Sequence, residues 1–146
     1  MRIAIGADWV GFEMKQGLVE HIRGLGHSVL DVGADSSEPN DYPDYAEKVG
    51  IAVVGDQADL GILVCGTGIG MSIAANKVNG IRAALCHDAF TAARARGHND
   101  ANVLALGALV VSLPHAIELV GIFLDAAYEA GRHESRLSKI RQLEER

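Results

Sequence analysis

The sequence predicts an α/β fold, a Rossmann-like three-layer sandwich around a five-stranded parallel sheet. Short apolar runs alternate with longer amphipathic segments along the whole chain, a pattern typical of parallel strands joined by right-handed helical crossovers. The chain has 146 residues, of which 49% are hydrophobic and 22% are charged. Because this length and composition suit one globular core, we expect residues 1–146 to form a single domain.

Each expected strand is a short apolar run, and each is followed by a segment of helical periodicity. The strands are expected at residues 2–6, 28–32, 59–65, 81–86 and 102–106, with Val110 and Val111 as an optional extension of the last. The helices are expected at residues 11–25, 45–54, 69–78, 89–96 and 114–130. Residues 35–44 are rich in serine, proline and asparagine, which predicts a loop.

The segment 114–130 differs from the other expected helices because it has almost no polar face. A helix that is apolar on most sides must be covered on most sides, and a small sheet covers only one of them. We therefore expect the C-terminal helix and tail to lie in a subunit interface. The alternative is that the C-terminal tail of the same chain folds over this helix.

Charge and cysteine content exclude several classes of function. The formal net charge of −6 argues against binding to nucleic acid, which requires a cationic surface. The two cysteines, Cys65 and Cys86, make no disulfide framework and suit a reducing compartment. No apolar stretch is long enough to span a membrane, and the N-terminal run is too short for a signal peptide. We expect a cytoplasmic protein without membrane or nucleic-acid partners.

The segment from Cys65 to Gly70, CGTGIG, is the strongest local signal. A buried strand ends in a thiol, and three glycines then lead into a helix. Successive glycines let backbone N–H groups converge on one concavity, and the helix N-terminus adds partial positive charge. Such a nest stabilises an anion, and its field favours the thiolate of Cys65 over the thiol. The spacing matches neither a P-loop nor a dinucleotide-binding motif.

Each part of this segment also has a simpler explanation. The glycines can serve only as a tight strand-to-helix turn, and a lone cysteine is commonly an inert core residue. Their combination at the carboxyl end of a strand favours a functional role. Cys86 ends a strand without a glycine loop, so we expect it in the core.

The remaining candidates follow from the rule that ligands of parallel α/β sheets bind beyond the carboxyl ends of the strands. This rule directs attention to Asp8 and Trp9, Cys65–Gly70, His87 and Asp88, and the approach to the fifth strand at His98–Asp100.

His98 can exchange protons near neutral pH, although a lone histidine is more often a surface or capping residue. Asp8 can hold a sugar hydroxyl or orient His98, or it can cap the following helix. Arg132 and Arg136 share one face of a helix and can bind one phosphate, or they can lie on an ordinary solvated helix. The spacing of the histidines and cysteines does not resemble a metal site, and we expect no metal or cofactor.

Five blocks of sequence together resemble a known family. They are GADWVGFEMK near the start, DYPDYA at 41–46, ADLGILVCGTGIGMSIAANKVNGIRAAL at 58–85, HNDANVLALG at 98–107 and YEAGRHESRL at 128–137. In this order they are similar to type B ribose-5-phosphate isomerase and the related galactose-6-phosphate isomerase subunits. The resemblance spans nearly the whole chain.

The resemblance implies a metal-free aldose–ketose isomerase that works through an enediol(ate) as a homodimer or homotetramer. Cys65 would be the base that moves a proton between C1 and C2, and Thr67 would shuttle protons among the sugar oxygens. The amides of Gly66, Gly68, Ile69 and Gly70 would hold the enediolate. His98, with Asp8, would open the furanose ring. Asn99, Tyr42 and Trp9 would contact the substrate, and Arg132 and Arg136 of a neighbouring subunit would bind its phosphate.

Two positions depart from the family pattern. The ribose-phosphate enzymes usually have histidine after the first aspartate, where this chain has Trp9, and arginine after the HNDANVLALG block, where it has Leu109. A phosphate that loses a charged hydrogen-bonding partner forfeits roughly 1.5–3 kcal/mol, or about ten- to a hundredfold in affinity. The expected substrate is therefore ribose 5-phosphate or another aldose, such as a tetrose, allose or galactose derivative. A non-catalytic sugar-phosphate sensor on the same fold is the remaining alternative.

Overall fold

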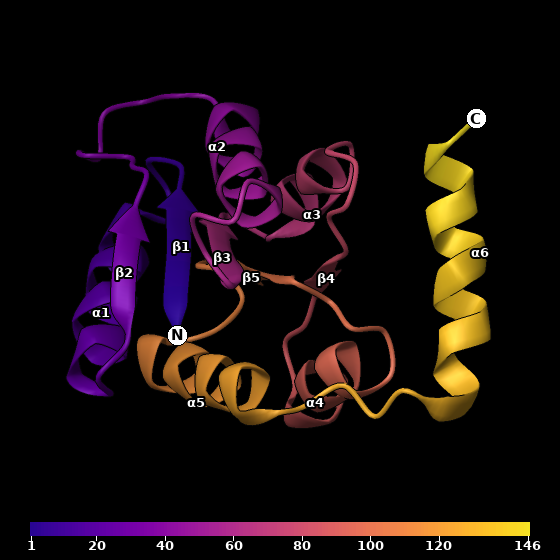
Figure 1. The fold of residues 1–146 in the computed structure, drawn as a ribbon. Coiled ribbons are helices and arrows are strands. Elements are labelled where there is room, and N and C mark those ends of the chain that lie inside the picture. Colours follow the sequence, from indigo (N-terminus) through magenta and orange to yellow (C-terminus); the bar gives the residue numbers. More distant parts are fainter.

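The computed structural model describes all 146 residues and contains one five-stranded, all-parallel sheet in the order β2-β1-β3-β5-β4 (Figure 1). The predicted fold class is confirmed. The strands are β1 (Arg2–Ala7), β2 (Ser28–Asp31), β3 (Leu60–Cys65), β4 (Ala83–Leu85) and β5 (Val103–Gly107). The helices are α1 (Phe12–Gly24), α2 (Tyr42–Val54), α3 (Ile69–Ala75), α4 (Ala89–Gly97), α5 (Leu113–Asp125), the 3-10 turn η1 (Gly131–His133) and α6 (Glu134–Glu144).

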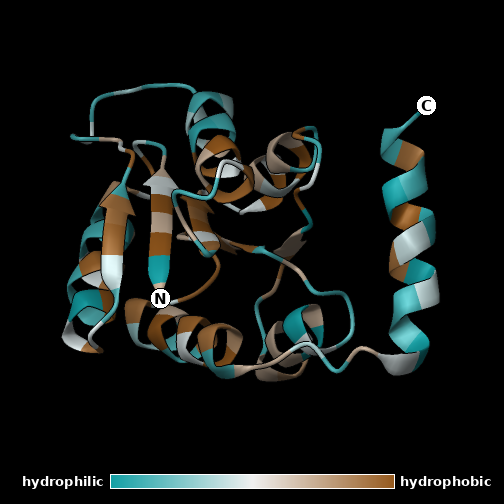
Figure 2. Cartoon of the chain, in the orientation of Figure 1, coloured by the Kyte–Doolittle hydropathy of each residue, from teal (hydrophilic) through white to brown (hydrophobic).

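Helices cover both faces of the sheet. Helices α1, α4 and α5 pack on one face, where the larger of two hydrophobic clusters contains Ile3, Ile5 and Phe123. Helices α2 and α3 pack on the other, around Ala4 and Met71. Successive strand residues thus face opposite layers, as the alternation of side chains in a strand requires. Apolar residues gather on the inner sides of the helices (Figure 2). None of the helices combines the length and the apolar content needed to span a bilayer.

Three of the element boundaries that differ from the sequence prediction do so for identifiable reasons. Helix α2 begins at Tyr42 rather than residue 45, because Pro43 is tolerated in the first turn of a helix. Helix α3 ends at Ala75 rather than residue 78, because the Asn76 amide bonds to the Ala83 backbone at 2.8 and 2.9 Å. Val110 and Val111 do not extend β5, since both of their N–H groups donate to the Gly107 carbonyl in a turn.

The C-terminal part of the chain differs most from the prediction. Helix α5 ends at Asp125 rather than residue 130, and α6 stands apart from the sheet (Figure 1). The tail therefore does not fold over α5. Helices α1 and α4 flank α5 in its own chain and cover more of it than its sequence suggested. The subunit interface at this helix and tail stays a prediction.

One polar residue, Lys15, lies in the core although its charge gave no sign of burial. Its side chain is 1% exposed and its ammonium contacts both carboxylate oxygens of Asp31, at 2.7 and 2.8 Å. Asp31 also accepts the N–H of Gly33 at 2.9 Å. This ion pair ties α1 to the end of β2 and satisfies a charge that would otherwise be costly to bury.

Candidate active site

The chain reverses its direction of winding between β1 and β3. After β1 it crosses to β2 on one side, and after β3 it crosses towards β4 on the other. The loops that follow β1 and β3 therefore diverge and leave a crevice at the carboxyl edge of the sheet, where ligands of open α/β sheets bind. The Asp8 N–H donates to the Val64 carbonyl at 3.2 Å and holds the two loops together at the base of this crevice.

The glycine loop, residues 65–70, presents the Cys65 thiol to this crevice. The Gly68 N–H donates to Cys65 Sγ at 3.2 Å, and the Ile69 N–H donates to Thr67 Oγ1 at 3.3 Å. A hydrogen bond from a backbone amide stabilises sulfur more strongly when it carries a negative charge. The hydrogen bond from Gly68 also fixes the position of Cys65 Sγ in the crevice.

Two glycines allow the loop to take this shape. Gly68 has a φ of +78°, and a Cβ placed there would lie 2.6 Å from Leu85 Cδ1 and 2.8 Å from the Leu106 carbonyl carbon. Gly107, at the end of β5, lies against Thr67, and a Cβ there would meet the Thr67 backbone at 2.7 Å. The loop is thus held closely against β5, and the close approach requires glycine at both positions.

The cavity at this edge, the carboxyl-edge pocket, has a volume of about 480 Å³, within the range of small-molecule sites. Its lining residues are Asp8, Val10, Tyr42, Cys65, Gly66, Thr67, Ile69, Gly70 and Ile73. Seven of these nine are sequence-predicted site residues. Gly68 supports the loop without lining the pocket, while Val10 and Ile73 are apolar residues that no motif singled out.

Asp8 and Tyr42 reach the pocket in different ways. Asp8 is 6% exposed, and its carboxylate accepts the Gly11 N–H at 3.0 Å. Gly11 is itself the N-cap of α1, so Asp8 bonds to the segment before the helix without being its cap, and it lines the same pocket as Cys65. The Tyr42 ring lies over Gly70, where an added Cβ would meet it at 2.5 Å. The first turn of α2 therefore closes one wall of the pocket over the glycine loop.

The two residues that depart from the family pattern lie at the rim. Trp9 is 43% exposed, and its backbone N–H donates to Asn40 Oδ1 at 3.0 Å. Leu109 is 77% exposed, and its N–H donates to the Gly66 carbonyl at 2.9 Å. Both side chains are free to meet a ligand or another protein surface above the loop.

His98 and Asn99 do not lie at this edge, which corrects their assignment to the carboxyl ends of the strands. They precede β5, and in a parallel sheet the approach to a strand lies at the amino edge. Strand β5 has five residues, which at about 3.3 Å per residue separate its two edges by roughly 16 Å. The His98 side chain therefore cannot act on a sugar held by Cys65 of the same chain.

A second cavity, the amino-edge pocket, brings the other predicted site residues together. It has a volume of about 400 Å³ and is lined by His98, Asn99, Arg132, His133, Arg136, Leu137 and Ile140. Arg132 lies in η1 and Arg136 in α6, so the two arginines share this pocket without lying on one helix, and Arg136 Nη1 donates to the Arg132 carbonyl at 3.4 Å. Two guanidinium groups beside a histidine suit a phosphate group.

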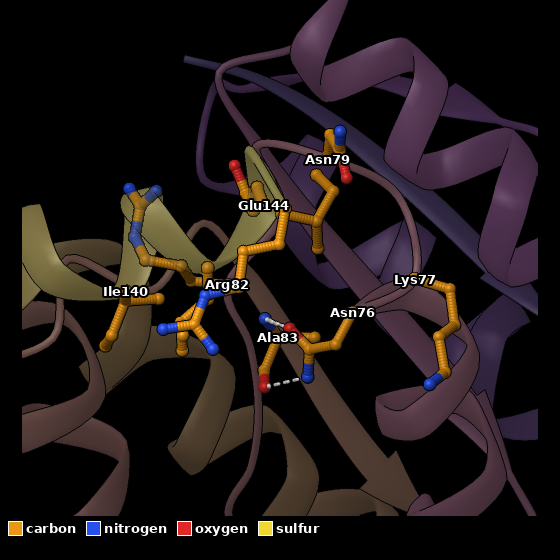
Figure 3. Close-up of a pocket in the computed structure, with 10 residues that line it drawn as sticks. Asn76, Lys77, Asn79, Arg82, Ala83, Ile140 and Glu144 are labelled. Carbon is orange, nitrogen blue, oxygen red and sulfur yellow. Dashed lines mark hydrogen bonds between the residues drawn. The ribbon is translucent and has the colours of Figure 1, made fainter.

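The largest cavity, of about 610 Å³, lies between α6 and the segment that joins α3 to β4 (Figure 3). There the Asn76 side-chain amide donates to the Ala83 carbonyl and accepts the Ala83 N–H. Glu144 accepts the Gly80 N–H at 2.9 Å. The lining contains none of the residues that the sequence predicted for the site, and its one carboxylate, Glu144, is already bonded to the backbone, so this cavity is a weaker candidate for the active site.

The other titratable candidates have structural roles. Cys86 lies in the larger core cluster, as predicted, and burial raises the pKa of its thiol. His87 Nε2 accepts the Gly107 N–H at 3.0 Å, and burial together with nearby His115 lowers the pKa of His87. His87 therefore holds the end of β5 in its neutral form. Asp88 caps α4 by accepting the Thr91 N–H at 2.7 Å, and this bond lowers the pKa of its carboxyl.

A Rossmann-like sheet with a thiol and a glycine loop at its carboxyl edge is typical of α/β proteins that bind small molecules at that edge. Residues 3–140 match the family model described as "Ribose/Galactose Isomerase". Ribose-5-phosphate isomerase B of Escherichia coli is 50% identical over 99% of this chain and 97% of its own length. D-erythrulose-4-phosphate isomerase of Pectobacterium atrosepticum is 45% identical over 96% of this chain and 93% of its own.

The solved structures agree with the sequence relatives. Ribose-5-phosphate isomerase B of Clostridium thermocellum superimposes with a TM-score of 0.98 at 46% identity, covering 99% of this chain and 98% of that one. The chain belongs to the ribose/galactose isomerase family. It is a sugar-phosphate isomerase of the aldose–ketose type, which favours an enzyme over the sensor alternative.

Proposed function

We propose that the protein interconverts ribose 5-phosphate and ribulose 5-phosphate, with Cys65 as the base. The observation that carries this proposal is the hydrogen bond that the Gly68 backbone N–H donates to Cys65 Sγ, a residue that lines the carboxyl-edge pocket. The names of the Escherichia coli and Clostridium thermocellum relatives support the choice of substrate. Aldose–ketose isomerisation needs a base near the α-carbon and donors for the enediolate oxygens, and both groups lie in this pocket.

The proton transfers follow from this arrangement. The Cys65 thiolate removes the C2 proton of the open-chain aldose, and the electron pair moves onto the carbonyl oxygen to give an enediolate. The amides of the glycine loop stabilise that charge. Thr67 carries a proton between O1 and O2, and Cys65 returns its proton to C1, which completes the ketose. The thiolate is regenerated, so the reaction has no net change in protons.

The phosphate end of the site comes from a second copy of the chain. His98, Arg132 and Arg136 lie at the opposite edge of the sheet from Cys65, so a complete site requires the amino-edge pocket of one subunit to face the carboxyl-edge pocket of another. A two-fold dimer makes two such sites at once. Exposed Ile69 and Ile73, at 52% and 59%, offer apolar surface beside the pocket for this contact. The assembly is a homodimer or a homotetramer.

Proton NMR in deuterated water tests this function directly. Wild-type protein incubated with ribose 5-phosphate is expected to produce ribulose 5-phosphate with deuterium entering at C2 of the remaining aldose. Free ribose serves as the matched control, because it lacks the group that the arginines bind. Binding of ribose 5-phosphate without exchange at C2 would contradict the proposed base.

A second candidate, the same reaction on another aldose or aldose phosphate, is favoured by Trp9 and Leu109. Both lie at the pocket rim in place of side chains that could bind a phosphate, and one relative is named for a four-carbon substrate. An indole can stack on a sugar face and shorten the site. The double variant Trp9→His and Leu109→Arg should then raise kcat/KM for ribose 5-phosphate about tenfold or more relative to a tetrose phosphate. Unchanged ratios would remove this candidate.

A further inference from the structure

The amino-edge pocket contains a cluster of titratable groups that the proton transfers above do not use. His98 Nε2 lies 3.0 Å from Glu129 Oε2, and the His133 ring stacks on the His98 ring with centroids 4.1 Å apart and an interplanar angle of 24°. His98 caps the end of α4, whereas Glu129 and His133 come from the segment that follows α5. Glu129 carries no role in the resemblance or in the motifs.

The Glu129 carboxylate is held in place by its own backbone and by a glycine. The Glu129 N–H donates to the Gly97 carbonyl at 2.9 Å, which fixes the segment beside the end of α4. A Cβ at Gly97 would lie 2.9 Å from Glu129 Oε2, so the carboxylate reaches His98 across a residue without a side chain. The next residue, Ala130, has a φ of +55°, a left-handed turn that brings His133 back over His98.

This geometry suits proton handling better than a shared cation. One ligand atom from each of His98, Glu129 and His133 lies within 4.8 Å of the other two, but stacked rings hold their lone pairs in nearly parallel planes, whereas the ligands of one Zn²⁺ must converge on it. Desolvation and the nearby His98 and Arg132 lower the pKa of His133, so His133 is neutral at neutral pH. The Glu129 carboxylate is the acceptor within hydrogen-bond distance of His98 Nε2, at 3.0 Å.

We infer that Glu129 is a positioning residue that makes His98 the acid–base group for opening the furanose ring, an inference that rests on the proposed function. A neutral imidazole that donates Nε2–H to a carboxylate has its lone pair on Nδ1. Nδ1 accepts the proton of the O1 hydroxyl, C1=O1 forms as the C1–O4 bond breaks, and the same proton passes to O4. Glu129 stabilises the imidazolium between these two transfers, as carboxylate partners of catalytic histidines do.

The test compares a substrate that must open with one that has no ring. Ribose 5-phosphate is mainly a furanose, whereas D-erythrose 4-phosphate cannot form one because its O4 carries the phosphate. Glu129→Gln keeps the shape and removes the charge. It should lower kcat/KM for ribose 5-phosphate about tenfold or more and change that for D-erythrose 4-phosphate less than about twofold. Glu118→Gln, an exposed carboxylate on α5, is the matched control.

A second measurement isolates ring opening from isomerisation. In a Cys65→Ala background, carbon-13 exchange NMR follows how fast the protein interconverts the α and β anomers of ribose 5-phosphate. Adding Glu129→Gln should abolish the acceleration. Equal losses on both substrates, or an unchanged anomer exchange rate, would overturn the role of Glu129. Failure of the wild-type protein to isomerise ribose 5-phosphate would instead overturn the proposed function.

Discussion

The carboxyl-edge and amino-edge pockets belong to the same domain but are built in opposite ways. The glycine loop packs closely against the end of β5. Gly68 lies against the backbone of Leu106, and Gly107 lies against the backbone of Thr67. Arg132 and Arg136 lie on the C-terminal arm, the segment formed by η1 and α6. Leu137 is the one buried residue of α6. The pocket proposed to perform the chemistry is therefore fixed by core packing, whereas the pocket proposed to bind the phosphate depends on what the C-terminal arm contacts. Preorganisation is strongest where charge develops.

The largest expected effect comes from removing the thiol of the carboxyl-edge pocket. Cys65→Ala should lower kcat about 100-fold to 10,000-fold, because a positioned base contributes a factor of this size. Sugar-phosphate binding, measured by calorimetry, should be nearly unchanged, since the arginines and amides remain. Both thiols are buried, but Cys86 does not line the carboxyl-edge pocket, so Cys86→Ala should retain activity. Retained isomerisation in Cys65→Ala would assign the base elsewhere.

Mixing two inactive variants tests directly whether the two pockets of one site come from two different chains. Cys65→Ala disables one pocket and His98→Ala the other. If each complete site takes one pocket from each of two chains, a re-equilibrated equimolar mixture should recover about a quarter of wild-type activity, because half of the dimers then hold one intact site. Mixing Cys65→Ala with wild-type protein controls for dilution. A mixture as inactive as its components would contradict the shared site.

Alanine substitutions at two glycines should distinguish the packed pocket from the arm. Gly68 and Gly131 both have left-handed backbones, with φ of +78° and +60°, but only Gly68 is crowded. Gly68→Ala should lower the free energy of unfolding by about 2 kcal/mol or more, from backbone strain plus overpacking. Gly131→Ala should cost about 1 kcal/mol from strain alone. Urea denaturation measures both, and equal losses would contradict the difference in packing.

The smallest expected effect is the pH dependence of stability that arises from His87 at the carboxyl edge. The pKa of His87 is lowered in the folded chain, so on acidification the unfolded chain takes up a proton first. The contribution of His87 to stability is thus lost as the pH falls from its ordinary value of about 6.5 towards the lower folded value. His87→Gln keeps an acceptor for the Gly107 N–H without titrating and should flatten the pH dependence of the urea midpoint in this window. An identical slope in both proteins would exclude this contribution.

The sequence predicted the carboxyl-edge pocket well because its main parts are contiguous. Residues 65–70 form one strand-to-turn-to-helix unit whose glycines have a local cause. The edge occupied by His98 was predicted wrongly, although the order of elements contained the answer, since a residue before a parallel strand lies at its amino edge. Tyr42 entered only through the family resemblance, because its contact with Gly70 joins distant segments.

The remaining differences are tertiary in origin. Lys15 occupies an inward helical position, but its partner Asp31 lies sixteen residues away, so its burial carried no local signal. Residues 126–130 have no strong helix breaker, yet the bond from Glu129 to Gly97 and the turn at Ala130 draw them out of the helix. Val10 and Ile73 line the pocket as ordinary apolar residues that no pattern distinguishes.

The two pockets lie at opposite edges of one parallel sheet. Under the proposed assembly, catalysis therefore depends on the concentration of associated subunits. A separated subunit would retain its thiol and its amides yet hold no phosphate against them. Specific activity should therefore fall on dilution below the dissociation constant of the dimer, and the substrate, by bridging two chains, should slow that fall.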